Sequence, residues 1–407
     1  MTAVSRSLPA GAALTIDNRD EAAGALERPA ARRAWAINGD FLTLQPTGVA
    51  RYAREVTAQL DALIGEGHPL TRGLDLELIV PRDGTPQFAN IPSRLVAEFN
   101  RPRLPQIWVQ LQLPAHVKSG LLSFCNLAPV AVRRQIVCIH DLHTRIMPES
   151  YGRLFRLAHR AILPLLGRRA ARITTVSGLS REHLVHYGVA PRSKIVVTHN
   201  GSDHTQDWSA ARSRLAERPA RPFVMCLGRP QKYKNVELML ALAPALDRLG
   251  LDLWMAGDID TSALQKPHGQ LPANVRLLGR ISDDDFAQAL AQAVCFLFPS
   301  RIEGFGLPAV EAMALGCPVV ASTSPCLPEV CGDSALFADP DDLDGWIQAI
   351  TKLEEDGALR NAMVAKGRAR AASYSWRAIA VRYLELMAEV DGEAISAPEQ
   401  ARRLGAQ

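Results

Sequence analysis

Two glutamates in the segment 299–322, PSRIEGFGLPAVEAMALGCPVVAS, give the strongest chemical signal in the sequence. Glu303 lies in a loop after an apolar run, and Glu311 lies in the first turns of a helix predicted to begin near Pro308. The free N–H groups at such a helix start bind anions. Phosphate alone does not call for two carboxylates, whereas vicinal sugar hydroxyls do. The pair therefore favours a ligand with phosphate and sugar over a helix-dipole contact plus a solvated loop charge.

Basic side chains gather in a second loop, GRPQKYKN (228–235), which follows the apolar run FVMCL and opens another helical pattern. Its cations are Arg229, Lys232 and Lys234. Two cations and a helix dipole would hold a diphosphate and stabilise it as a leaving group. The alternative is a solvated basic loop. Because the strand–loop–helix context repeats that of the glutamate segment, we predict Arg229 and Lys234 as diphosphate-binding, catalytic residues.

Two places in the first part of the sequence could approach the same ligand. Gly48 ends the loop in NGDFLTLQPTGVARYARE (38–55), where a missing side chain would let the backbone approach a phosphate. His140 and Asp141 directly follow an apolar run. A single histidine is more often structural than catalytic, but a His–Asp pair at the carboxyl end of a strand is a better catalytic candidate.

Two further patterns point to cofactors that we do not predict. GFGLPA (304–309) resembles part of a dinucleotide-binding fingerprint, but the next strand-like run ends without the acidic residue that binds ribose. Asp258-Ile259-Asp260 and Asp342-Leu343-Asp344 have a spacing that can bind a metal ion, but Asp also begins turns at such places. We therefore expect neither a cofactor nor a metal.

Parallel sheets would bring these loops together, and the apolar runs alternate with helical patterns as such sheets require. The helical patterns begin near 49, 235 and 307, and a further one covers 341 to about 391 with a break near Tyr374. The predicted fold class is α/β. The predicted strands are 33–38, 74–80, 120–124, 134–139, 172–176, 194–198, 223–227, 251–256, 275–279, 294–298 and 318–322.

The length of 407 residues suggests two domains. Residues 1–32 lack sustained periodicity and are predicted to be a disordered leader. A polar stretch at 202–221 is the best boundary. We expect a first domain at 33–205, a second domain with the two charged loops at 206–375, and a C-terminal helix at 376–391.

The order of these motifs resembles the retaining glycosyltransferases of family 4. The resemblance is collinear from about 35 to 390 and includes VCIHDL, ITTVSGLSREHLVHYGV, KIVVTHNG, VRLLGRIS and LPEVCGDSALFADP besides the segments above. The Glu-x7-Glu block is its most specific part. The resemblance implies the GT-B fold, two Rossmann-like domains facing each other across a cleft. The domain at 33–205 would be the acceptor-side domain and that at 206–375 the nucleotide-sugar-binding domain. The helix at 376–391 would return to the first of them. His199 and Ser202 depart from the family pattern, in which proline and valine are usual.

The resemblance also implies roles for the candidate residues. Arg229 and Lys234 would hold the donor diphosphate, Glu303 and His140 would lie at the transferred sugar, and Glu311 would bind the ribose. It implies retention of configuration without a metal ion. The donor would be a UDP- or GDP-sugar such as GDP-mannose, and the acceptor a glycan or lipid-linked molecule of surface polysaccharide or lipopolysaccharide synthesis. Further donor-binding positions would be Gly48, Ile281, Phe305, Gly306 and Leu307.

Three alternatives remain at this point. A sugar-nucleotide epimerase would convert the donor without an acceptor. A catalytically silent partner subunit would bind the donor without reaction, although Glu303, Glu311, Arg229 and Lys234 argue against it. A nicotinamide-dependent dehydrogenase is disfavoured by the context of GFGLPA.

Charge and cysteine content bear on the surroundings of the protein. A net charge of +4 fits phosphate ligands or an anionic membrane and is too small to indicate nucleic acid. Seven cysteines without a CxxC pattern favour free thiols in a reducing, cytoplasmic compartment. Residues 151–172 contain six arginines and no acidic residue, interleaved with leucines. This stretch predicts either a core helix with solvated arginines or a helix, divided by Pro164, on the cytoplasmic face of an anionic membrane.

Overall fold

The computed structural model describes residues 32–45, 47–82, 88–99, 105–215, 219–259 and 271–393. The predicted leader thus lies outside the described residues except for Arg32. The described strands form one sheet of seven and one of six, and every neighbouring pair within a sheet is parallel. This arrangement confirms the predicted α/β class. The domain limits drawn from the sequence stay a prediction.

The first sheet has the order β3-β2-β1-β4-β5-β6-β7. Its central strands β4 and β5 are buried along their whole length, as expected for strands covered on both faces. The strands are β1 (Arg33–Asn38), β2 (Leu74–Val80), β3 (Ser93–Leu95), β4 (Gly120–Ser123), β5 (Gln135–Cys138), β6 (Arg172–Thr175) and β7 (Ile195–Val197). The helices around it include η1 (Gly39–Thr43), α1 (Gly48–Gly65), α2 (Pro105–Ile107), η3 (Trp108–Gln112), α3 (Leu113–His116), α4 (His143–Ile146), η4 (Pro148–Ser150), α5 (Arg153–Arg169) and α6 (Gly178–His186).

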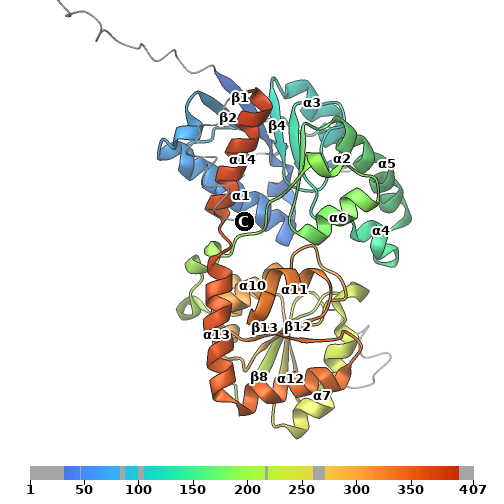
Figure 1. Cartoon of the computed structure of the whole chain (residues 1–407), viewed down its shortest axis with the longest axis vertical. Coiled ribbons are helices and arrows are strands. Elements are labelled where there is room, and N and C mark those ends of the chain that lie inside the picture. Colours follow the sequence, from blue (N-terminus) through green and yellow to red (C-terminus); the bar gives the residue numbers. More distant parts are fainter. Residues whose placement is uncertain are drawn as a thin grey trace, which may run out of the picture.

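The second sheet has the order β10-β9-β8-β11-β12-β13, and its helices lie around it in the lower half of Figure 1. The strands are β8 (Phe223–Leu227), β9 (Asp252–Ala256), β10 (Val275–Gly279), β11 (Phe296–Phe298), β12 (Val319–Ser322) and β13 (Ala335–Ala338). The helices include η8 (Lys232–Lys234), α7 (Val236–Arg248), α9 (Asp283–Gln292), α10 (Leu307–Ala314), α11 (Cys326–Cys331), α12 (Leu343–Glu355) and α13 (Gly357–Ala372).

The eleven predicted strands are confirmed with shifts of at most two residues at their ends, and two short strands were missed. β3 is an edge strand of three residues, and β13 has four, so neither shows a periodic pattern long enough to detect. The predicted division of the 151–172 helix at Pro164 is wrong, because α5 continues through it. Pro164 cannot donate to the carbonyl of Arg160, and the Arg145 guanidinium approaches that carbonyl instead at 3.5 Å.

The chain passes between the two halves twice, and the two passages contact each other. A Cβ on Gly201 would lie 2.3 Å from the backbone nitrogen of Trp376, so only glycine fits there. Asp203 accepts a hydrogen bond from that same Trp376 N–H at 2.9 Å. The second passage leads into α14 (Trp376–Asp391), which lies beside α1 in the upper half of Figure 1, whereas α13 lies in the lower half.

Buried polar contacts fasten α14 to the first sheet. Within its middle, the Tyr383 hydroxyl lies 3.0 Å from the Tyr52 hydroxyl of α1. At its end, Asp391 accepts hydrogen bonds from the Trp35 indole at 3.0 Å and the Arg33 guanidinium at 2.8 Å, and it also pairs with Arg134. The side chains of Arg33 and Asp391 are only 5% and 4% exposed. No helix of the described residues is long and apolar enough to cross a membrane.

Replacing Asp391 with alanine is expected to destabilise the protein by roughly 2–3 kcal/mol, because the buried Arg33 guanidinium loses its closest partner. The free energy of unfolding in urea measures this. Asp333→Ala is the matched control, since Asp333 forms an exposed ion pair with Lys366 and its loss should not be measurable. Equal stability of the two variants would show that Asp391 does not fasten α14.

Candidate active site

The predicted site loops follow the strands at which each sheet reverses its order. β1 adjoins β4 in the first sheet, and β8 adjoins β11 in the second. Ligands of such sheets bind at the carboxyl ends of these strands, where neighbouring connections leave in opposite directions. The loops 39–47, 228–235 and 299–306 directly follow β1, β8 and β11. The topology therefore brings the two charged loops of the second half to one edge.

Lys234 and Glu303 contact each other at this carboxyl edge of the second sheet. The Lys234 ammonium donates to Glu303 Oε1 at 2.6 Å, and the side chains are 16% and 11% exposed. The same ammonium lies 5.3 Å from the centre of the Tyr233 ring and 5.5 Å from that of Phe298. A cation for phosphate and a carboxylate for hydroxyl groups thus occupy one partly desolvated place. Arg229 is exposed on the same loop.

Asn235 holds the two loops together. Its backbone is left-handed, with φ 55°, a conformation that Asn adopts more readily than most residues. Its side-chain amide donates to the carbonyl of Pro299 at 3.2 Å and to that of Pro340 at 2.8 Å. The Arg301 N–H also donates to the Tyr233 carbonyl at 2.8 Å. These contacts explain how residues separated by 69 positions form the Lys234–Glu303 pair.

The start of α10 has the properties of an anion site. Gly306 precedes the helix with φ 94°, and a Cβ there would lie 2.6 Å from a methyl carbon of Leu327. No side chain of the described residues caps this helix end. The N–H groups near Phe305, Gly306 and Leu307 are therefore placed where a phosphate could accept from them. Phe305 and Leu307 are themselves buried, at 3% and 5% exposure.

Glu311, one turn further along α10, is buried and held by two residues that the sequence analysis missed. His204 Nε2 lies 2.9 Å from Glu311 Oε1, and Arg51 Nε lies 3.7 Å from the same oxygen. The Trp376 indole N–H donates to His204 Nδ1 at 2.9 Å. Because an indole can only donate, Nδ1 carries no proton and Nε2 donates to Glu311. Both contacts use Oε1. Within the described part of the chain, Oε2 is therefore left to accept from a ligand hydroxyl.

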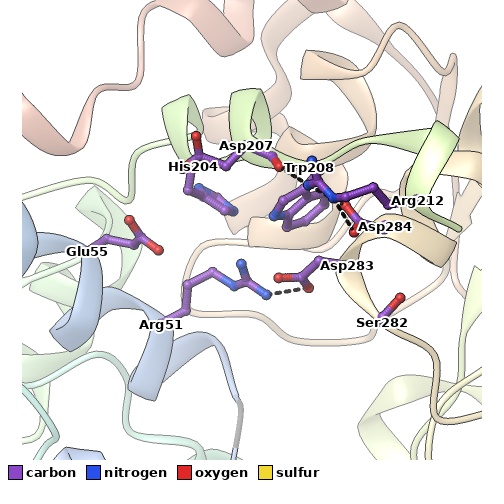
Figure 2. Close-up of a pocket in the computed structure, with 9 residues that line it drawn as sticks. All are labelled: Arg51, Glu55, His204, Asp207, Trp208, Arg212, Ser282, Asp283 and Asp284. Atoms are coloured by element: carbon purple, nitrogen blue, oxygen red, sulfur yellow. Dashed lines mark hydrogen bonds and ion pairs between the residues drawn. The ribbon is translucent and has the colours of Figure 1, made fainter. Parts of the chain in front are cut away.

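A pocket of about 400 Å³ adjoins Glu311 and has walls from both halves of the chain (Figure 2). Arg51 and Glu55 of α1 face the start of α9, and Arg51 donates to Asp283 at 2.7 Å. Burial lowers the pKa of Arg51, but the carboxylates of Glu311, Asp283 and Glu55 outweigh it and the pKa is raised. The helices η6 (Asp203–Asp207) and η7 (Ala210–Arg212) also line the pocket. The pocket residues are Arg51, Glu55, His204, Asp207, Trp208, Arg212, Ser282, Asp283 and Asp284.

None of the predicted site residues lines this pocket. Glu311 touches two lining residues, and Ile281 directly precedes a third, Ser282. The pocket is therefore a neighbour of the predicted donor site, on the side of Glu311. Spacing could not reveal the contacts of Arg51 and His204 with Glu311, because both residues lie far from Glu311 in the sequence. Arg51 belongs to the segment 38–55, but that segment pointed only to Gly48.

His140 belongs to the first half of the chain, where it follows β5, and its side chain is 4% exposed. Its Nε2 is 2.7 Å from the Phe124 carbonyl oxygen, which can only accept, so Nε2 donates there. Burial lowers the pKa of His140, but Cys138, the Phe124 carbonyl and Asp141 outweigh it and the pKa is raised. A Cβ on Gly304 would lie 3.1 Å from the His140 carbonyl oxygen. The histidine thus adjoins the glutamate loop, but contact between Nε2 and a sugar requires exchange of its present hydrogen bond.

Gly48 and the described residues of the Asp-X-Asp patterns take no part in the contacts of Lys234, Glu303 and Glu311 given above. Gly48 is exposed at the start of α1, and a Cβ there would have no heavy atom within 4 Å. Asp258 pairs with Arg280 at 3.0 Å, and Asp260 lies outside the described residues. Asp342 caps α12 by accepting from the Gly345 N–H at 3.1 Å. Among the described residues no group of three His, Cys, Asp or Glu side chains could hold a metal ion.

Comparisons with known proteins agree with the arrangement of the two halves. The profile described as "Glycosyltransferase Family 4" matches residues 46–206, and that described as "Glycosyl transferases group 1" matches residues 209–370. Among solved structures, sucrose-phosphate synthase from Thermosynechococcus elongatus superposes with a TM-score of 0.67 at 19% identity, covering 89% of this chain and all of that one. This likeness shows the fold.

Two curated relatives are mannosyltransferases. The O-antigen chain mannosyltransferase B of Escherichia coli is 30% identical over 261 residues, which cover 61% of this chain and 68% of the relative. The GDP-mannose-dependent monoacylated alpha-(1-6)-phosphatidylinositol monomannoside mannosyltransferase of Corynebacterium glutamicum is 25% identical over 371 residues, 86% of this chain and 92% of the relative. With the two family profiles, these matches show that the chain belongs to the group 1 glycosyltransferases of family 4, enzymes of the GT-B fold.

Proposed function

We propose that this glycosyltransferase moves a hexose, with mannose from GDP-mannose as the first candidate, to a glycan or lipid-linked acceptor with retention of configuration. The observation that supports this best is the Lys234–Glu303 pair at the carboxyl edge of β8 and β11, one helix turn and a loop away from the buried Glu311. The two relatives described above are named as an O-antigen chain mannosyltransferase and a phosphatidylinositol monomannoside mannosyltransferase, which supports a role in surface polysaccharide or lipopolysaccharide synthesis.

In this proposal each charged group has one part of the donor to bind. The uncapped start of α10, Lys234 and Arg229 face the diphosphate and stabilise the charge that develops on it as the sugar leaves. Glu311 Oε2 accepts from the ribose hydroxyls. Glu303 accepts from hydroxyls of the transferred sugar, near the His140–Asp141 loop that touches Gly304. The base then lies toward Ile281, and Gly48 approaches the donor from the first half.

The cellular setting is also proposed. All seven cysteines are free and six are buried, which supports a reducing compartment such as the cytoplasm. Nucleotide-sugar donor and acceptor would meet there, with the enzyme able to lie on the cytoplasmic face of the inner membrane.

The function is tested by incubating the purified full-length chain with UDP-, GDP-, ADP- and dTDP-sugars and a membrane lipid extract. We expect sugar transfer from GDP-mannose to a component of the extract, undiminished by EDTA because Lys234 and Arg229 supply the positive charge. A new donor isomer without transfer would indicate an epimerase, and donor binding without reaction a silent partner subunit. Activity that EDTA abolishes and Mn²⁺ restores would contradict the metal-free proposal.

The two glutamates should separate in their effects. Glu311→Ala is expected to weaken binding of free GDP by roughly tenfold or more, because a hydrogen bond to a charged group is lost. Glu303→Ala should leave GDP affinity unchanged and lower the transfer rate by about 100-fold or more. Isothermal titration and initial rates measure these, with Glu237→Ala, an exposed residue of α7, as the control. Equal loss of GDP affinity in both variants would contradict the assignment.

His204 should act on donor binding through Glu311. His204→Phe removes the N–H that orients the carboxylate and is expected to weaken GDP binding about tenfold. His204→Gln retains an N–H donor and should restore most of the affinity. Thermal unfolding without ligand separates this effect from a loss of stability. GDP affinity unchanged in His204→Phe would show that Arg51 alone holds Glu311 in place.

A further inference from the structure

Helix α5 has an apolar face toward the protein and another toward solvent. Its inner face packs Leu163 and Leu166, both nearly fully buried, against Val137 and Ile173 of the first sheet. A helix of a globular protein usually needs only this one apolar stripe. The sequence pattern of 151–172 combined the leucines of both faces, and only the packing separates them.

The outer face is a continuous apolar stripe. Leu154, Leu157, Ala158, Ala161 and Leu165 follow the spacing i, i+3, i+4, i+7, i+11, which places them on one side of an α-helix, and all five are exposed. Leu154 is 84% exposed, Leu157 63% and Leu165 44%. Among the described residues, the exposed large apolar side chains outside this helix are Leu95, Phe99 and Leu111. A stripe of leucines in water indicates a surface that binds something apolar.

Arginines border the stripe and identify its partner. Arg153 and Arg160 lie on one flank, and Arg168 lies at the C-terminal end; all three are exposed. Arg169 on the other flank is also exposed, but its guanidinium donates to the Val130 carbonyl at 2.7 Å. No acidic residue occurs between 151 and 172. An apolar stripe flanked by arginines of the same helix complements an anionic bilayer, in which leucines enter the acyl boundary and arginines reach the phosphates.

Tyr151, which lies just before α5, connects the start of this helix with the candidate site. The ring of Tyr151 stacks on that of Phe155 with centres 5.9 Å apart. Burial raises the pKa of Tyr151, and its neighbours Tyr233, Asp141 and Glu303 raise it further. Tyr233 directly precedes Lys234, and the centre of its ring lies 5.2 Å from the centre of the His143 ring of α4. In Figure 1, α4 is at the edge of the upper half that faces the second half, and α5 lies on the outer side.

We propose that the outer face of α5, defined by Leu154, Leu157, Ala158, Ala161 and Leu165 with its arginine border, docks on an anionic lipid bilayer. Docking places Tyr151 and Tyr233 at headgroup level, so that an acceptor held by a lipid anchor reaches Glu303 from the bilayer side. The docking needs no assumption about the reaction, whereas the lipid-anchored acceptor rests on the proposed function.

Co-sedimentation with vesicles tests the docking without any substrate. The full chain should bind vesicles of phosphatidylglycerol and phosphatidylcholine at low salt, bind less at high salt, and not bind phosphatidylcholine alone. Leu154→Ser with Leu157→Ser, and separately Arg153→Glu with Arg160→Glu, should each lower the partition coefficient about tenfold or more. Failure of the wild-type chain to bind anionic vesicles overturns the proposal.

Matched variants test the position of the surface. Phe99→Ser with Leu111→Ser removes two other exposed apolar side chains, and Arg248→Glu with Arg368→Glu makes the same change of net charge elsewhere. Both should bind anionic vesicles as the wild type does, and equal loss in them overturns the assignment to α5. A polarity-sensitive dye at Leu157→Cys should shift to the blue on vesicles, whereas the same dye at Leu111→Cys should not.

Donor binding keeps the two proposals distinguishable. The α5 variants should show the same thermal shift with GDP-mannose as the wild type, because their side chains lie outside the donor site. Vesicle binding with no response to any nucleotide sugar would leave the docking standing and contradict the proposed donor. A loss of the GDP-mannose response in the α5 leucine variant alone would overturn the view that α5 is only a docking element.

Discussion

The contact between the two chain passages at Gly201 and Trp376 governs how the two halves sit together. Only glycine leaves room for the Trp376 backbone, and Asp203 then accepts the Trp376 N–H at 2.9 Å. The Trp376 indole in turn fixes which nitrogen of His204 bears the proton, and His204 holds Glu311. A single crossing point thus links the start of α14 to Glu311, a carboxylate of the candidate donor site. A change in the crossing angle would move Glu311 relative to α1, from which Arg51 approaches.

The second general feature is that charges in the site pair with one another. Lys234 pairs with Glu303 within the second half, and Arg51 approaches Glu311 across the halves. Burying an unpaired charge at such low exposure costs free energy, so pairing stabilises these side chains when no ligand is bound. A nucleotide sugar offers each of them a complementary group, phosphate for the cations and hydroxyls for the carboxylates. The arrangement therefore favours a ligand with both kinds of group over phosphate or sugar alone.

Helix α5 relates the site to its surroundings. Its inner residues belong to the same apolar cluster as β5 and β6, so the helix is a rigid part of the first half. The outer leucines and arginines of α5 therefore have a fixed position relative to the neighbouring Tyr151 and Tyr233. In the docking that we propose, this rigidity would distinguish α5 from a flexible tail, which would merely raise the local concentration of enzyme at a membrane.

The amino-acid sequence by itself determined the longer strands, the loops after β8 and β11, and the family, because these depend on local periodicity and on residues that are close in the chain. It missed the short strands β3 and β13. It also indicated Glu303 and Lys234, which lie in loops after predicted strands, and Glu311, which lies in the first turns of the predicted helix that follows. Only the tertiary structure decided that Lys234 and Glu303 touch, that His204 and Arg51 hold Glu311, and that the leucines of α5 divide between core and solvent. Each of these results depends on which elements pack together, and residues such as His204 and Glu311, 107 positions apart, show no periodic or spacing signal of their contact.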